Sequence, residues 1–226
     1  DSINTAAQEY SPVLSSDGER LYFCQNKGGL LSSDENVLVA RQQDGEWTKA
    51  ILLTPFEKSG YNESPLSISS DGTRLLVFEN GRLIQAVKTA EGWRSAGPLG
   101  DQINSGYWQG DACFTADGQG LIFASKREDT QGAGKEDIDL YISRKNNLGE
   151  WQAPINLGPQ INTPLLDRSP FLHPDQKTLY FSSSGHGGIG NLDVFKIQRL
   201  DDSWTRWGPP VHLGRGINTP QQDWGF

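Results

Sequence analysis

Acidic side chains recur at matching places in this sequence, where they could bind a cation or hold the backbone. Each stands just before a short apolar segment: Glu9, Glu63, Asp111, Asp167 and Asp223. Carboxylate oxygens are the ligands that calcium prefers. Carboxylates that accept hydrogen bonds from backbone N–H groups would recur in the same way, because a structural role needs the same residue in every copy. Both interpretations stay open, and we favour the structural one over bound calcium.

A second acidic group lies in the segment REDTQGAGKED, residues 127–137. Glu136, Asp137 and the nearby Asp139 could form a surface calcium site. A solvated acidic hairpin is the simpler interpretation, since runs of charge usually face water.

Aromatic side chains outside the repeated pattern are the better candidates for binding. Tyr107 and Trp108 stand where the other copies carry small or polar residues, and Trp207 and Trp224 also lie outside the regular tryptophan series. Flat aromatic faces beside acidic groups suit sugar rings or a protein partner, and tyrosine and tryptophan are common in binding hot spots. Packing of Trp108 beneath a loop is an equally good interpretation.

No residue is predicted to be catalytic. His173, His186 and His212 are scattered rather than paired at ligand spacing, and the glycine-rich segment 184–190 lacks the lysine and the following helix of a phosphate-binding loop. No G-x-S-x-G motif is present. A pair of glycosidase carboxylates stays open, because the distance between such groups is set by folding. An enzymatic activity stays open, and we favour a non-enzymatic protein.

The balance of charge and hydrophobicity limits the partners. The 226 residues carry a formal net charge of -8, whereas nucleic acids and anionic membranes require a basic face. No apolar stretch reaches the roughly 20 residues that cross a bilayer, and no signal peptide is seen. Because the chain contains no methionine, we expect a mature or trimmed product. Cys24 and Cys113 lie in strand-like segments and are expected to be buried thiols rather than a disulfide.

A segment beginning Ile-Asn recurs at a spacing of roughly fifty residues or a multiple of it, which indicates a repeat architecture. The copies are INTAAQEYSP at 3–12, INSGYWQGDACF at 103–114, INTPLLDRSP at 161–170 and INTPQQDWGF at 217–226. Each full unit has an acidic residue that leads into a first strand, then a turn, two further strands and a fourth strand that carries a tryptophan. These tryptophans are Trp47, Trp93, Trp151 and Trp204.

The turns predict how the strands pair. Asp-Gly at 17–18, 71–72 and 117–118 supplies the positive φ of a tight hairpin. The fourth unit has Asp175 and Gln176 at this place, so we expect a longer type I turn there. Apolar residues spaced by two after each turn indicate half-buried strands.

Four strands per unit, repeated without helical patterns, predict an all-β fold, namely a β-propeller of four-stranded blades. The expected repeats are 3–60, 61–102, 103–160 and 161–216, with a partial repeat at 217–226, in a single domain 1–226. Whether the ring has four blades or is part of a larger ring stays open. In a propeller, Glu9, Glu63, Asp111 and Asp167 would gather near one mouth of the central channel.

The units SPVLSSDGERLYF, SPLSISSDGTRLLVF and SPFLHPDQKTLYFSSSGHGGIGNLDVF resemble the TolB-type, WD40-like propeller repeat over nearly the whole chain. The I-N-T lead and the segment from Trp151 to Gly158 look like the variety found with OmpA-family cell-envelope proteins of Gram-negative bacteria. This resemblance implies a periplasmic, outer-membrane-associated or secreted protein. No OmpA-like peptidoglycan-binding domain is present in these residues.

The resulting functional prediction is a non-enzymatic binding or scaffold propeller of the bacterial cell envelope. We expect its rim loops to engage an envelope protein. The alternative is a glycan-binding or glycan-processing propeller with its site at the channel mouth, so a carbohydrate partner stays open.

Overall fold

The computed structural model describes residues 2–27, 35–56, 61–127 and 137–225. Within this part of the chain the regular structure consists of strands, with no helix. None of it forms a helix long and apolar enough to cross a membrane. Cys24 and Cys113 are buried free thiols, as expected.

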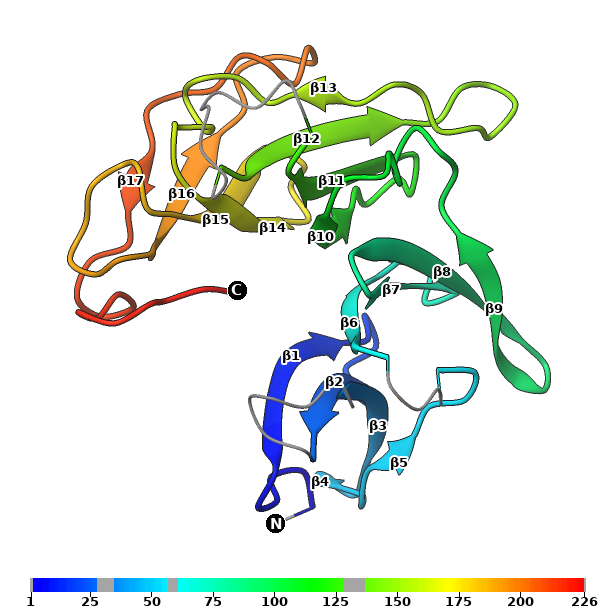
Figure 1. Cartoon of the computed structure of the whole chain (residues 1–226). Coiled ribbons are helices and arrows are strands. Elements are labelled where there is room, and N and C mark those ends of the chain that lie inside the picture. The colour runs from blue at the N-terminus through cyan, green and yellow to red at the C-terminus, as the bar shows by residue number, and fades with distance from the viewer. Residues whose placement is uncertain (1, 28–34, 57–60, 128–136, 226) are drawn as a thin grey trace. The chain divides into compact units, whose positions relative to one another are not determined.

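The strands form four antiparallel sheets, which we number as blades in chain order (Figure 1). Blade 1 contains β1 (Gln8–Leu14), β2 (Arg20–Asn26), β3 (Glu35–Gln43), β4 (Glu46–Trp47) and β5 (Ile51–Leu52). Blade 2 contains β6 (Glu63–Ile68), β7 (Arg74–Glu79), β8 (Arg82–Thr89) and β9 (Gly92–Pro98). Blade 3 contains β10 (Gln109–Phe114), β11 (Gly120–Ser125), β12 (Asp139–Arg144) and β13 (Ile155–Asn156). Blade 4 contains β14 (Asp167–Leu172), β15 (Thr178–Ser183), β16 (Asp193–Gln198) and β17 (Val211–His212).

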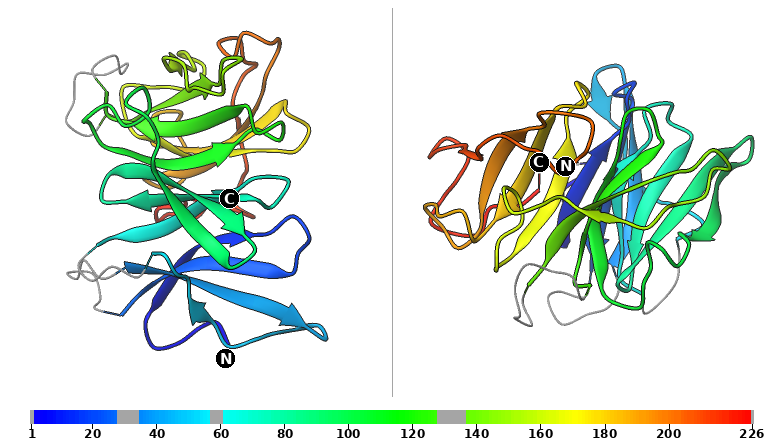
Figure 2. Two further views of the ribbon diagram at one scale, coloured as in Figure 1. Left: turned by 90° about the vertical axis from the view of Figure 1, so that its right-hand side faces the viewer. Right: turned by 90° about the horizontal axis from the view of Figure 1, so that it is seen from above.

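The chain divides into two compact units, residues 1–99 and 100–226, with two blades in each. Within each unit the two sheets lie face to face (Figure 2) and share one apolar core. In the first unit Tyr22 and Leu75 are core residues from facing sheets, and in the second unit Leu140 and Phe181 play this part. Burial of such side chains stabilises each pair of sheets by about 2 kcal/mol per residue. The prediction of a single domain over 1–226 stays a prediction.

The hairpin turn between the first two strands has the same form in blades 1 and 4. In blade 1 the Gly18 N–H donates to the Ser15 carbonyl, and Gly18 has a φ of 73°. In blade 4 the Gln176 N–H donates to the His173 carbonyl, and Gln176 has a φ of 60°. The turn in blade 4 is therefore not longer than the others, and the expected extra length is wrong. Asp175 makes four hydrogen bonds in this turn. Its N–H donates to the His173 ring, and its carboxylate accepts from the Lys177 N–H and from the N–H and hydroxyl of Thr178. These bonds hold Gln176 in a left-handed conformation that glycine adopts more readily.

The first strand contains an extra residue, a β-bulge, at the same place in blades 1, 3 and 4. The pairing shifts after Tyr10, Gly110 and Arg168, and the extra residue has positive φ in each case. Gln109, and not Asp111, occupies the place of Glu9 and Asp167, because each of these three residues stands two positions before the extra residue. The cross-strand partners that define this place are Glu9–Gln25, Glu63–Glu79, Gln109–Ser125 and Asp167–Ser183. Asp111 is instead the bulged residue, which re-aims its side chain.

The tryptophan series is also corrected in blade 4. Trp47, Trp93 and Trp151 pair with the end of the third strand of their blades. In blade 4 the residue that pairs in this way is Trp207, through Arg199, and not Trp204. Both blade-4 indoles are buried, so Trp207 is a core residue rather than an exposed binding aromatic.

Candidate binding site

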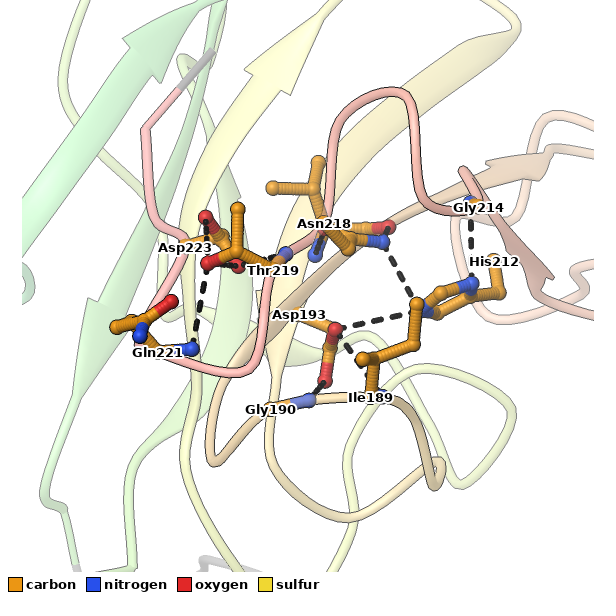
Figure 3. A network of polar contacts seen from close by, with 10 residues as sticks. Ile189, Gly190, Asp193, His212, Gly214, Asn218, Thr219, Gln221 and Asp223 are labelled. Carbon is orange, nitrogen blue, oxygen red and sulfur yellow. Dashed lines mark hydrogen bonds and ion pairs between the residues drawn. The ribbon is translucent and has the colours of Figure 1, made fainter.

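Three of the repeated acidic side chains accept hydrogen bonds from a threonine four residues earlier in the chain. Thr163 donates from its backbone N–H (2.5 Å) and its hydroxyl (2.8 Å) to Oδ2 of Asp167. Thr219 binds Asp223 through the same two groups (Figure 3), and so does Thr5 with Glu9. These three carboxylates accept local hydrogen bonds in the way that the structural interpretation requires.

In two of the repeats, the asparagine of the Ile-Asn segment forms hydrogen bonds with the preceding blade. Asn162 accepts from the Leu140 N–H at 2.8 Å and donates to the Leu140 carbonyl at 2.9 Å. Asn218 does the same with Val194, at 2.7 and 3.0 Å. The amide side chain thus satisfies the backbone N–H of a residue in the third strand. It is also a second donor to the carbonyl of that residue, which accepts from the Leu157 N–H in blade 3 and from the Leu213 N–H in blade 4. The parallel bridges Ile138–Leu166 and Leu192–Gln222 continue each contact.

The lead carboxylates differ in their electrostatic surroundings. Burial raises the pKa of Asp167 to about 7, the hydrogen bonds from Ser183 and Thr163 oppose this rise only in part, and the nearby Asp139 adds to it. Burial is the largest single effect on Glu9 and raises its pKa, but the hydrogen bonds from Thr5 and Gln25 together outweigh it, so the pKa lies below its ordinary value. Asp167 and Glu9 therefore differ in protonation although both accept hydrogen bonds from a threonine.

The four carboxylates that we expected at a channel mouth belong to different units. Glu9 and Glu63 lie in the first unit, and Asp111 and Asp167 in the second. Glu63 is fully buried. Their gathering around one channel stays a prediction, as does bound calcium.

The acidic segment after blade 3's second strand is not solvated where the structure describes it. Glu136 lies outside the described residues. Asp137 and Asp139 are buried, so the expected solvated hairpin is wrong for these two side chains. Among the described residues, no three acidic, histidine or cysteine side chains are grouped as ligands for a metal ion.

Asn156 organises the outer edge of blade 3. Its Nδ2 donates to Oδ2 of Asp139 at 2.8 Å. Its Oδ1 accepts from the Gly158 N–H at 2.9 Å and from Nδ2 of Asn162 at 2.7 Å. One amide side chain therefore supplies the donor and the acceptor that this position needs.

His212 takes the corresponding place in blade 4 (Figure 3). Its Nδ1 accepts from the Gly214 N–H at 3.0 Å, while Nε2 lies 3.3 Å from Oδ1 of Asp193 and 2.9 Å from Nδ2 of Asn218. A neutral imidazole has one donor and one acceptor nitrogen, so it cannot satisfy all three contacts at once. The ring is a less suitable occupant of this position than an amide.

Asp111 holds an arginine of the next blade. Arg168 donates through Nε at 2.6 Å and through Nη2 at 3.1 Å to the two carboxylate oxygens of Asp111. The backbone N–H and hydroxyl of Ser169 also donate to Oδ2 of Asp111, each at 3.2 Å. This two-pronged geometry is the strongest form of carboxylate–guanidinium pairing. Both side chains are only partly exposed, which fixes the guanidinium in place.

Two indole rings contact the same guanidinium. The Cζ atom of Arg168 lies 4.8 Å from the ring centre of Trp224 and 5.9 Å from that of Trp108. Trp108 also lies over Gly110, where an added Cβ would come within 2.5 Å of its ring. Trp224 is 50% exposed and Tyr107, next to Trp108, is 42% exposed. We call Trp108, Arg168, Asp111 and Trp224 the Arg168 cluster.

The structure thus brings three of the predicted binding residues together, Asp111, Trp108 and Trp224, around a residue that the sequence reasoning missed. Arg168 follows the lead acid of blade 4, where the other units carry Tyr10, Ser64, Gly110 and Trp224. A basic residue at only one of these positions was the available signal. Tyr107 lies beside the cluster because it is next to Trp108 in the sequence. Glu9 and Glu63 lie in the other unit.

No family model matches the sequence, and no curated protein matches it. Among solved structures, a putative 6-phosphogluconolactonase from Bacteroides fragilis has a TM-score of 0.52 at 15% identity, covering 92% of this chain and 55% of that one. A putative TolB from Agrobacterium tumefaciens has a TM-score of 0.50 at 17% identity, covering 88% of this chain and 64% of that one. Inulosucrase from Halalkalicoccus jeotgali, bound to kestose, has a TM-score of 0.54 at 17% identity, covering 95% and 69%.

Likeness at this level of identity shows the fold and not the activity. The chain has a β-propeller fold with four blades, and its structural neighbours include a TolB-like protein. It spans less than two thirds of the length of the first two of these structures.

Proposed function

We propose that this protein is a binding propeller of the bacterial cell envelope that engages a protein partner through the surface around Tyr107, Trp108 and Trp224. The observation that carries the proposal is the Arg168 cluster, in which a half-exposed indole rests on a guanidinium that is itself held by Asp111. Rigid tryptophan and arginine side chains are the residues most enriched in binding hot spots. The envelope location rests on the resemblance of the repeats to the TolB type.

The contacts of the acidic leads also support a binding role over a catalytic one. Glu9, Asp167 and Asp223 each accept hydrogen bonds from a threonine of their own lead, and Asp111 is paired with Arg168. Carboxylates engaged in this way hold the blades. The aromatic surface beside them is left to meet a partner.

Site-specific photo-crosslinking in the source organism tests the proposal. A benzophenone amino acid is placed at Tyr107 or at Trp224, and cross-linked products are identified by mass spectrometry after fractionation of the envelope. Tyr61 is the matched control, because it is an aromatic residue of similar exposure, 39%, in the first unit. The proposal predicts one shared protein adduct in the envelope fraction at 107 and 224 that is missing at 61.

Identical adducts at all three positions, or adducts only with cytoplasmic proteins, would refute the proposal. Substitution of Trp224 by alanine in the chain that carries the cross-linker at 107 should abolish the specific adduct. This second variant separates a loss of partner contact from poor cross-linking at a single position.

A carbohydrate-processing propeller is the second candidate, and one observation favours it. Asp167 has its pKa raised to about 7 by burial, with Asp139 contributing, and paired carboxylates with separated pKa values perform glycoside hydrolysis. Turnover of oligosaccharides that Asp167→Asn abolishes would favour this candidate. Unchanged folding of the variant must accompany that loss.

A further inference from the structure

We propose that the Arg168 cluster binds a proline-rich segment in the polyproline II conformation. The inference rests on the proposed function, because it specifies which part of a protein partner occupies this surface. It follows from the kinds of hydrogen-bonding groups that the cluster presents, from its charge and from its aromatic faces.

The cluster presents donors. Arg168 uses Nε and Nη2 to bind Asp111, and no described residue accepts a hydrogen bond from its Nη1. The indole N–H of Trp224 likewise has no acceptor among the described residues. The Arg168 side chain is 24% exposed, and Trp224 is more exposed still. A ligand at this surface therefore meets N–H groups that require oxygen acceptors.

The acceptors of the cluster are already occupied. Asp111 receives Nε and Nη2 of Arg168, and Ser169 adds its N–H and its hydroxyl to the same carboxylate. A sugar presents hydroxyl groups that donate as well as accept, and these donors would find no free carboxylate in the cluster. A peptide backbone made of prolines carries carbonyl acceptors and no N–H donors. Its hydrogen-bonding pattern is the complement of the cluster.

Charge and shape lead to the same class of ligand. Asp111 neutralises Arg168 at hydrogen-bonding distance, and the whole chain has a net charge of -8, so neither nearby nor distant charge attracts an acidic peptide. Proline rings stack on aromatic side chains, and the polyproline II helix loses little conformational entropy on binding because it is already extended. The exposed face of Trp224 suits such a ring.

The inference is tested with hexaproline that is acetylated and amidated at its ends, titrated into the purified chain. The readout is the indole N–H resonance of each tryptophan in a nitrogen–proton correlation spectrum. We expect the Trp224 resonance to shift with saturation. In Trp224→Ala, where the Trp108 resonance is followed in its place, the affinity should fall at least about tenfold. Trp224→Phe keeps an aromatic face and removes the N–H donor, so it should retain part of the affinity.

Trp151→Ala is the matched control, because Trp151 makes a cation–π contact of 4.8 Å with Lys145 in the same unit. It should leave hexaproline binding unchanged. A glycine–serine peptide of the same length and a neutral hexasaccharide should not shift the Trp224 resonance.

Three outcomes would overturn the inference. These are no shift of Trp224 at millimolar hexaproline, an equal loss of affinity in Trp151→Ala, and a Trp224 shift produced by the hexasaccharide and not by hexaproline. The first result together with specific photo-adducts at 107 and 224 would leave the proposed protein-binding function standing and remove only the proline-rich ligand. The third would remove both, because the surface would then bind carbohydrate.

Discussion

Replacing Asp167 by asparagine should make the second unit less sensitive to pH. The pKa of this buried carboxyl is raised from 3.8 to about 7, and a shift of one pKa unit corresponds to about 1.4 kcal/mol. Ionising Asp167 in the folded unit therefore costs about 4 kcal/mol. Asparagine keeps one oxygen for the two donors of Thr163 and has no charge to bury.

The sign follows from the raised pKa. Below pH 4 the carboxyl is protonated in both the folded and the unfolded chain, so the free energy of unfolding is not reduced. Between about pH 4 and pH 7 the unfolded chain loses its proton first, and the free energy of unfolding falls as the pH rises. The stability of Asp167→Asn relative to the original chain should thus increase by about 4 kcal/mol from pH 4 to pH 8.

Hydrogen exchange in urea, resolved to peptides that contain β12 and β14, measures the stability of this unit at each pH. Asp223→Asn is the control, since Asp223 is bound by Thr219 in the same way but is partly exposed. This control should keep the pH dependence of the original chain. If Asp167→Asn also keeps it, the assignment of the buried charge to Asp167 is refuted.

Three further predictions follow from single contacts. His212→Asn should raise the melting temperature at pH 7 by a few degrees, because Asn156 satisfies the same three contacts in blade 3; a lower melting temperature would contradict this. Gln176→Gly should stabilise by about 1 kcal/mol in urea unfolding, since Gln176 has a φ of 60°; an unchanged midpoint would show that its backbone is not strained. Gly110→Ala should change the fluorescence of Trp108, whose ring lies 2.5 Å from the added Cβ, and an unchanged spectrum would mean that the backbone yields instead.

The repeated turns and strand spacings predicted the blades well, because hairpins are specified locally. Asp17 shows why, since its side chain accepts from the Ser15 hydroxyl and the Glu19 N–H within a single turn. Apolar residues spaced by two then place Leu21 and Phe23 in the expected second strand. Such contacts involve neighbours in the sequence, and a single sequence displays them.

The errors arose where residues were matched by type and not by position. Asp111 was aligned with the lead acids because it is acidic, although Gln109 follows Ile103 by the same six residues that separate Glu9 from Ile3. Trp204 was chosen over Trp207 because the turn before the pairing tryptophan is longer in blade 4. The Arg168 cluster was missed as a unit, since its members come from segments more than fifty residues apart and meet only after the blades have packed.

The amide contacts of Asn162 and Asn218 also affect how such an array can be cut and extended. Each asparagine forms hydrogen bonds with the blade that precedes it in the chain. A blade that is cut out just before the isoleucine of the next repeat would therefore lose this asparagine and its hydrogen bonds. The module that can be transplanted intact runs from just after the lead acid of one blade to the lead acid of the next. Engineers who splice blades, and gene duplications that multiply them, should find their workable junctions after the lead acid rather than before the isoleucine.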